Sequence, residues 1–246
     1  MCSYSLIGIS LEALNLGLLI SYEKRMLDER LKELNNYNCL NILSDITLDN
    51  LEINKEVLKL LVFISLSDDK LVSNFVKYNF ELLSTLVNHF KETQSFDEIN
   101  SIVMIMSNFS ISVPKLMNFL VEEYFADFII KKLFYFNLID KRNILHFLYI
   151  LSFRTLEHET TLSIESLKDL VFQPAIRLIL HNSLKYEEGE QALLLIKYLF
   201  ENTSFGCDYL IYNQEFYYRC LQITEKTNYS TLNKNIISWV DSLQHC

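Results

Sequence analysis

Residues 55–90 read KEVLKLLVFISLSDDKLVSNFVKYNFELLSTLVNHF, and this stretch decides the fold. Apolar residues recur every three or four positions on both sides of a polar break at Ser65–Lys70, which is typical of amphipathic helices. The second apolar segment is interrupted near Tyr78–Asn79, where a third helix is expected to begin. The stretch therefore predicts a unit of three helices joined by short turns.

The same pattern returns 45 residues later in the sequence. Residues 55–90 form the second unit of the chain, and the unit that follows, the third, covers about Asp97–Phe136. It is preceded by Ser95, which forms a capping-box pattern with Glu98. After a shift of 45 residues, seven positions of the two units carry similar residues: Leu60/Ile105, Leu61/Met106, Ile64/Phe109, Ser65/Ser110, Phe75/Leu120, Phe80/Phe125 and Leu83/Phe128. An internal match of this kind predicts a stack of helical repeats.

Two further units follow, and they are less regular. The fourth covers about Lys141–Leu180; its first helix is expected to end at Ser152, and the long polar segment Phe153–Ser163 indicates an insertion. Pro174 is expected to interrupt or restart the next helix, because proline has no backbone N–H to donate. An acidic loop at Tyr186–Glu190 is expected to precede the fifth unit.

The two ends of the chain are also predicted to be helical. Residues 3–35 read as a helix, Asn38–Ile46 closes this first unit, and Thr231–Gln244 has the pattern of a helix that caps the last repeat. The chain has only four glycines and two prolines, and no linker rich in Gly, Ser or Pro interrupts it. Residues 1–246 are therefore expected to form a single domain.

The composition narrows the classes of function. Half of the residues are hydrophobic, which excludes global disorder, and the net charge of −9 argues against a protein that binds nucleic acid directly. Acidic residues gather at Glu122–Glu123 and Glu187–Glu190. They can be solvated turns and helix ends, or they can form an acidic surface for a basic partner.

Cysteine usage and the apolar N-terminal stretch bear on the location of the protein. Five scattered cysteines with no C-x-x-C spacing support neither a disulfide framework nor a zinc site, so a cytoplasmic or nuclear location is expected. The stretch Leu6–Ile20 is about 15 residues long and carries Glu12 and Asn15, which favours a buried first helix over a membrane span.

The sequence predicts no enzyme, no cofactor, no metal site and no small-molecule substrate. It has no glycine-rich phosphate loop and no nucleophile elbow, and neither Cys207 nor Cys220 has a histidine nearby in the sequence. His146 lies in an apolar helical segment and is interpreted as a core residue. Many aromatic residues are assigned to the core by their helical spacing: Phe119, Tyr124, Phe125, Phe128, Phe134, Tyr135, Phe136, Phe147 and Tyr149.

The repeated units resemble those of the armadillo/HEAT-like repeat family. The family's first helix ends near a leucine–serine pair, and the matching positions here are Phe63-Ile64-Ser65, Asn108-Phe109-Ser110, Leu151-Ser152 and Leu199–Asn202. The resemblance implies an all-α, right-handed α–α superhelix of about five armadillo-like repeats with a terminal capping helix. Asn79, Tyr124 and Gln214 stand where the family frequently has a glycine before the last helix.

The resemblance also implies a curved protein-binding surface along the last helix of each unit. The positions expected there are Asn88, Lys131, Arg177, His181, Tyr217 and Tyr218. Importin-α-like members carry a ladder of Trp and Asn on this surface, whereas the single tryptophan here, Trp239, lies in the terminal helix. The resemblance therefore does not support the binding of nuclear localisation signals.

Three functions remain open at this point. The first is a non-enzymatic adaptor or scaffold subunit of a larger complex, binding a protein partner. The second is an armadillo-like nucleotide-exchange co-chaperone of Hsp70, suggested by fold and size alone. The third, and the least supported by the sequence, is a helical protein anchored to a membrane by residues 6–20.

Overall fold

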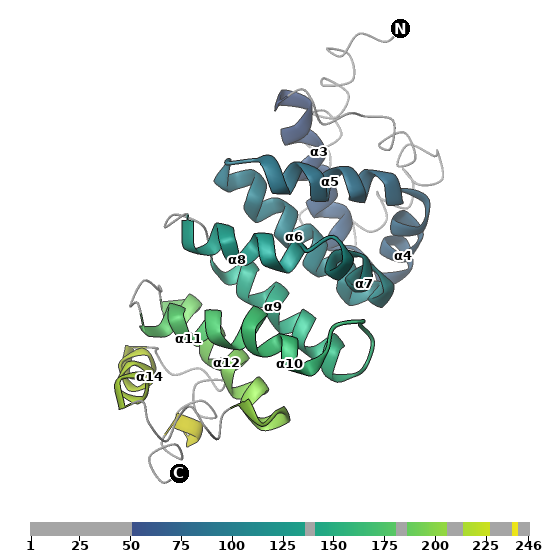
Figure 1. The fold of residues 1–246 in the computed structure, drawn as a ribbon. Helices are drawn as coiled ribbons and strands as arrows, with labels where there is room; N and C mark the ends of the chain where they lie inside the picture. Colours follow the sequence, from purple (N-terminus) through teal and green to yellow (C-terminus); the bar gives the residue numbers. More distant parts are fainter. Residues whose placement is uncertain (1–50, 136–140, 181–185, 206–213, 227–237, 241–246) are drawn as a thin grey trace, which may run out of the picture. The chain divides into compact units, whose positions relative to one another are not determined.

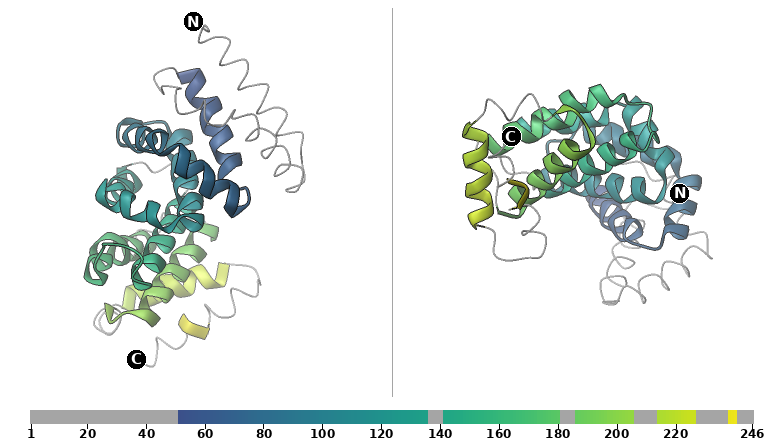
Figure 2. Two further views of the ribbon diagram at one scale, coloured as in Figure 1. Left: turned by 90° about the vertical axis from the view of Figure 1, so that its right-hand side faces the viewer. Right: turned by 90° about the horizontal axis from the view of Figure 1, so that it is seen from below.

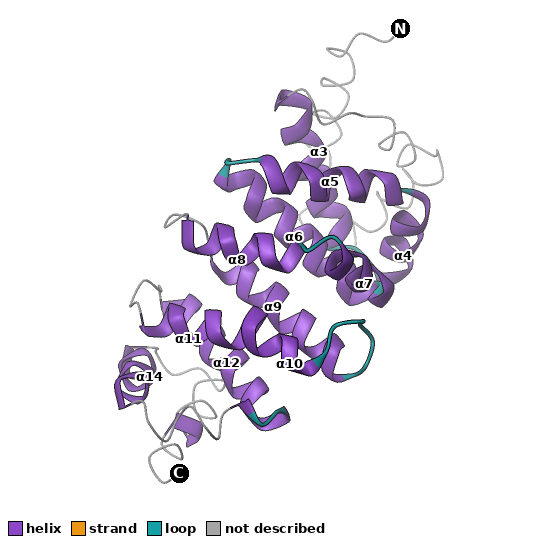
Figure 3. Ribbon diagram, viewed as in Figure 1, coloured by secondary structure: helices purple, strands orange, loops and turns teal. Residues whose placement is uncertain are grey.

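The computed structural model describes residues 51–135, 141–180, 186–205, 214–226 and 238–240. Within these ranges the chain forms helices, turns and loops, and no strand is present (Figures 1 and 3). Figure 2 shows the same helices from two other directions. The predicted all-α fold is confirmed for this part of the chain. The expectations for residues 3–35 and 38–46, and for most of 231–244, lie outside the described ranges.

The chain divides into two compact units, Met1–Leu116 and Met117–Cys246. The first unit contains α3 (Leu51–Ser65), α4 (Asp69–Tyr78), α5 (Phe80–Glu92) and α6 (Phe96–Ser112), and the boundary falls inside α7 (Pro114–Glu122). The second unit contains α8 (Phe125–Tyr135), α9 (Lys141–Leu156), α10 (Ile164–Leu167), the π-helical turn η2 (Lys168–Phe172), α11 (Gln173–Leu180), α12 (Tyr186–Asn202) and α14 (Gln214–Lys226). A single domain for the whole chain remains a prediction.

The four long helices follow one period. The helices α3, α6, α9 and α12 begin at residues 51, 96, 141 and 186, so each begins 45 residues after the one before. Within the first unit α3 packs beside α6, and within the second α9 packs beside α12. In five of the residue pairs matched 45 residues apart, both residues are buried: Leu60/Ile105, Leu61/Met106, Ile64/Phe109, Ser65/Ser110 and Phe75/Leu120. The internal repeat is confirmed, although Phe80 is 43% exposed where Phe125 is buried.

The capping box at the start of α6 is only half formed. The Ser95 hydroxyl accepts a hydrogen bond from the Glu98 N–H at 3.5 Å, as predicted. The Glu98 carboxylate, however, does not reach back to the N–H of Ser95. It lies 2.8 Å from His89 Nε2 and 2.5 Å from the Thr93 hydroxyl, so it joins the end of α5 to α6 instead.

Two predicted boundaries in the second unit are wrong. The helix α9 continues to Leu156, four residues beyond Ser152, whose buried hydroxyl donates to the Leu148 carbonyl within the helix. The predicted acidic loop is the first turn of α12, and Glu188 in this turn is only 2% exposed. Its carboxylate accepts a hydrogen bond from the Lys141 N–H at 3.0 Å, at the start of α9, where a helix has N–H groups without an internal partner. The interpretation of this acidic group as a solvated turn therefore fails for Glu188.

The expected change of helix geometry near Pro174 is confirmed. In η2 the Gln173 N–H donates to the carbonyl of Lys168, five residues earlier, and α11 begins at Gln173. Pro174 is the second residue of α11, which continues directly from η2, and its missing N–H donates no hydrogen bond to the preceding turn.

The turn between α7 and α8 contains a strained residue. Tyr124 has φ 56°, whereas Asn79, at the same repeat position in the first unit, has φ −124°. The left-handed conformation costs a non-glycine residue roughly 1–2 kcal/mol. Tyr124 is 68% exposed, so burial of its ring compensates little of this cost.

Substitution of these two residues by glycine is expected to have opposite effects. Tyr124→Gly removes the strain but raises the entropy of the unfolded chain, so the free energy of unfolding should rise by about 0.5 kcal/mol. Asn79→Gly loses the 2.9 Å hydrogen bond from Asn79 Nδ2 to the Phe75 carbonyl and should lower it by about 1–2 kcal/mol. Urea denaturation followed by circular dichroism measures both, and a loss of stability in Tyr124→Gly would contradict the strain.

Gly189 allows α12 and α14 to approach closely. A Cβ atom at this position would lie 2.9 Å from Ile223 Cγ2 of α14. Overpacking of this kind costs typically 1–3 kcal/mol, and the better helix propensity of alanine offsets about 0.5–1 kcal/mol. Gly189→Ala should therefore lower the free energy of unfolding by about 1 kcal/mol. In a double-mutant cycle with Ile223→Ala, the combined loss should be smaller than the sum of the single losses; additive losses would show that the two residues are not in conflict.

Candidate functional site

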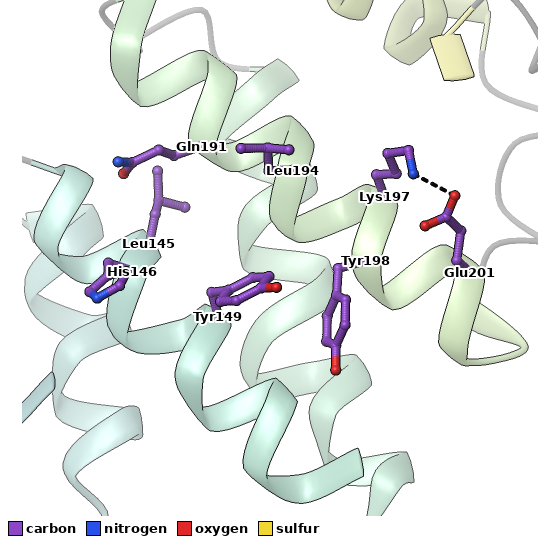
Figure 4. A pocket seen from close by; sticks show the side chains of 8 residues that line it. All are labelled: Leu145, His146, Tyr149, Gln191, Leu194, Lys197, Tyr198 and Glu201. Carbon is purple, nitrogen blue, oxygen red and sulfur yellow. Dashed lines mark hydrogen bonds and ion pairs between the residues drawn. The ribbon is translucent and has the colours of Figure 1, made fainter. Parts of the chain in front are cut away.

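A groove runs between α9 and α12 on the surface of the second unit (Figure 4). Its volume is about 470 Å³. Three lining residues come from α9 and five from α12: Leu145, His146, Tyr149, Gln191, Leu194, Lys197, Tyr198 and Glu201. On α12, Gln191, Leu194, Tyr198 and Glu201 follow one another at intervals of three or four, with Lys197 next to Tyr198, so they form one stripe beside the stripe that the helix buries.

The middle of the groove is apolar and aromatic. Leu145 and Tyr149 line the α9 wall, and Leu194 and Tyr198 line the α12 wall (Figure 4). The rings of Tyr149 and Tyr198 have their centroids 5.0 Å apart, and their planes are inclined by 51°. Burial raises the pKa of Tyr198, as do Tyr149 and the Glu157 carboxylate. Both tyrosines thus offer a ring face together with a hydroxyl.

The ends of the groove are polar. Lys197 Nζ and Glu201 Oε1 form an ion pair at 2.5 Å at the end where Tyr198 lies. His146 and Gln191 lie at the other end. The Gln191 side-chain oxygen is buried and has no hydrogen-bond partner among the described residues. A ligand in the groove therefore meets an apolar centre between two polar ends.

The prediction of His146 as a core residue is wrong. The side chain is exposed and lines the groove. It shares α9 with Phe147, which is fully buried, because adjacent residues of a helix point in directions about 100° apart. The groove walls partly desolvate the ring, and this desolvation lowers the pKa of His146.

The assignment of the aromatic run to the core is correct for some residues and wrong for others. Phe125 and Phe147 are buried and pack edge to face, with centroids 5.3 Å apart. Tyr124, Phe134 and Tyr149 are exposed. Tyr149 is 38% exposed and lies in the groove. It is a candidate functional residue that was missed because its helical spacing assigned it to the core.

The residues predicted to bind a partner lie elsewhere. Asn88, Lys131 and Arg177 are exposed on α5, α8 and α11, and none of the three lines the α9–α12 groove. On α14, Tyr218 is 61% exposed and Tyr217 is half-buried, with ring centroids 5.9 Å apart. His181 lies outside the described residues. A binding role for these residues remains a prediction.

A second groove lies at the equivalent position of the first unit, between α3 and α6, with a volume of about 540 Å³. Lys55, Lys59 and Ser101 line it at the repeat positions of Leu145, Tyr149 and Gln191, two periods earlier in the chain. Asp97 and Glu98 also line it. The repeat therefore places a groove in each unit, one charged and one aromatic.

The described residues bring together no group that resembles a catalytic site. Burial raises the pKa of the Cys220 thiol to about 12, so the thiol is not the thiolate that a nucleophile requires. No cluster of three or more His, Cys, Asp or Glu residues that could hold a metal ion is found in these parts of the chain.

Comparison with known proteins identifies the fold. A designed armadillo repeat protein superposes with a TM-score of 0.68 at 14% sequence identity, covering 99% of this chain and 95% of the designed one. The fold is an armadillo-like helical repeat. A second engineered protein gives a TM-score of 0.61 at 14% identity over 96% of this chain and 97% of the other. No protein-family model and no curated protein sequence matches the chain.

The resemblance to armadillo-like repeats predicted from the sequence is thus confirmed. Armadillo-like repeats typically bind proteins and are usually not catalytic. None of the described helices is long and apolar enough to cross a membrane, and the segment Leu6–Ile20 lies outside the described ranges.

The pKa of His146 can be measured directly. Its imidazole is expected to titrate below pH 6.5 in an NMR titration, with His146→Gln assigning the signal. Because the unfolded chain then binds a proton before the folded chain does, the free energy of unfolding should fall as the pH drops through 6.5, and less so in His146→Gln. A midpoint at or above 6.5 would show that the groove does not desolvate the ring.

Proposed function

We propose that this protein is a non-enzymatic adaptor or scaffold subunit that binds an extended segment of a partner protein in the α9–α12 groove. The observation that carries the proposal is the contacting pair of exposed Tyr149 and half-buried Tyr198, which lines the middle of a groove with polar ends. Tyrosine is enriched among the residues that dominate protein interfaces, because a rigid ring with a hydroxyl gives a large contact area at a low cost in entropy.

The dimensions and polarity of the groove support a peptide segment. A volume of about 470 Å³ lies in the range of about 300–1,000 Å³ that is typical of ligand pockets. Tyr149 and Leu194 offer apolar surface to side chains of the segment. Gln191 and the Lys197–Glu201 pair offer hydrogen-bonding groups at the two ends, which suits the N–H and C=O groups of a main chain.

The location proposed for this activity is the cytosol or the nucleus. Cys220 is a free thiol in the core, and the five cysteines are odd in number and scattered along the sequence. Such usage fits a reducing compartment.

The double variant Tyr149→Ala/Tyr198→Ala tests the groove. Loss of a central anchor typically costs about 2 kcal/mol or more, which is roughly 30-fold for each residue, so the double variant should weaken binding on the order of 1,000-fold. The tagged full chain is expressed in its own cells and purified, and the bound proteins are quantified by mass spectrometry. One or two partners at stoichiometric level are expected with the wild type and should be lost with the double variant.

The control is Tyr78→Ala/Phe134→Ala, which removes two exposed aromatic residues outside the groove. It should retain the partner. Equal recovery with all three chains would exclude the groove as the binding site. Recovery of Hsp70 alone, released by ATP and accompanied by faster ADP release, would instead establish the co-chaperone alternative.

A further inference from the structure

Three departures from the 45-residue repeat lie around a different groove in the second unit. The loop between α9 and α10 covers residues 157–163, whereas α3 and α4 of the first unit are separated by residues 66–68 only. The π-helical turn η2 has no counterpart among the described residues of the first unit. Tyr124 is the left-handed residue of the α7–α8 turn. Residues of all three line one groove of about 340 Å³. Figure 3 shows the loop 157–163 and the α7–α8 turn in teal.

Hydrogen bonds fix the long loop in this position. The Thr161 N–H donates to Asn118 Oδ1 of α7 at 2.8 Å, and the hydroxyls of Thr155 and Thr160 lie 2.9 Å apart. The anchored loop presents Leu162 to the groove, where the side chain stays half-buried. The insertion is therefore a built wall of the groove.

The π-helical turn supplies one apolar and one acidic residue to the groove. It contributes Leu170 to the apolar lining and Asp169 to the rim, and Asp169 is exposed. A single extra residue per turn re-aims side chains in this way, and π-helical turns are frequent at functional sites. Asp169 Oδ1 accepts a hydrogen bond from Gln173 Nε2 at 3.3 Å.

The groove combines apolar walls with an acidic rim. Val121, Leu162 and Leu170 are half-buried, so a ligand side chain can cover them. The charged residues that line the groove are Asp127 and Asp169, and no lysine, arginine or histidine is among the lining residues. The exposed ring of Tyr124 completes the rim and can stack on a cation.

We propose that this groove is a second docking site, for a segment of a partner protein that carries an apolar side chain next to a lysine or arginine. The apolar side chain lies against Val121, Leu162 and Leu170, and the cation lies between Asp127, Asp169 and the Tyr124 ring. Charge complementarity selects this occupant, because the two carboxylates repel phosphate groups of nucleic acids and of anionic lipids. The site shares no lining residue with the α9–α12 groove, so it stands whether or not that groove binds a partner.

A random peptide library displayed on phage tests the site. The full chain carrying Tyr149→Ala/Tyr198→Ala serves as the target, so that the α9–α12 groove does not compete for peptides. The enriched peptides should share an apolar residue adjacent to lysine or arginine. Synthetic copies, labelled for fluorescence polarisation, should bind more weakly as the ionic strength is raised.

Two substitutions and a matched control locate the binding. Asp127→Asn/Asp169→Asn should weaken the peptides at least about tenfold and remove most of the salt dependence. Glu92→Gln/Glu215→Gln changes the net charge equally, at exposed positions outside the grooves described above, and should leave the affinity unchanged. Leu162→Ser provides a second test of the apolar wall and should also weaken binding. Circular dichroism and the thermal midpoint establish that each variant is folded.

Several results would overturn the proposal. A selection without binders would do so, as would enriched peptides that lack a basic residue. An equal effect of the control and of Asp127→Asn/Asp169→Asn would show that net charge alone attracts the peptides. An unchanged affinity in both Asp127→Asn/Asp169→Asn and Leu162→Ser would place the binding at another surface.

Discussion

Packing between successive long helices is the constraint on which each unit depends. The helices α9 and α12 lie side by side, and α12 buries Ala192, Leu193, Leu195, Ile196 and Leu199. Burial of apolar surface stabilises a fold by about 25 cal/mol per Å². The positions that form this buried stripe must therefore return at a fixed interval, here 45 residues. The neighbouring stripe of residues, which lines the groove, can vary because it does not pack against the next helix.

This division explains how one scaffold offers two kinds of groove. Lys55 and Lys59 on α3 occupy the repeat positions of Leu145 and Tyr149 on α9. The backbone geometry repeats while the side chains change from cationic to apolar and aromatic. In this chain the long helices thus fix where the two grooves lie, and the variable stripe determines the chemistry of their lining.

The sequence was sufficient for the architecture because the buried stripe is periodic. Both residues of the pairs Leu60/Ile105 and Ile64/Phe109, from two successive repeats, are buried, and that regularity was visible in the residue types alone. The groove was not predictable in the same way. The helix α9 is apolar on more than one side, so hydrophobicity does not distinguish buried Phe147 from exposed Tyr149 and His146. Glu188 was assigned to a solvated turn for the opposite reason: the charge pattern does not show that the N-terminus of α9 lies within reach of its carboxylate.

The positions that break the repeat carry information that the repeat itself does not. A periodic array is stabilised by nearest-neighbour contacts, so the packing of the array does not require an insertion, a π-helical turn or a strained residue. Tyr124 shows this most directly, because its left-handed backbone is unfavourable and its ring is mostly exposed. Strain of this kind persists where the surroundings impose it, and it concentrates at ligand sites. That Tyr124, the loop 157–163 and η2 all meet at one groove therefore favours a functional origin for these departures over accumulated irregularity.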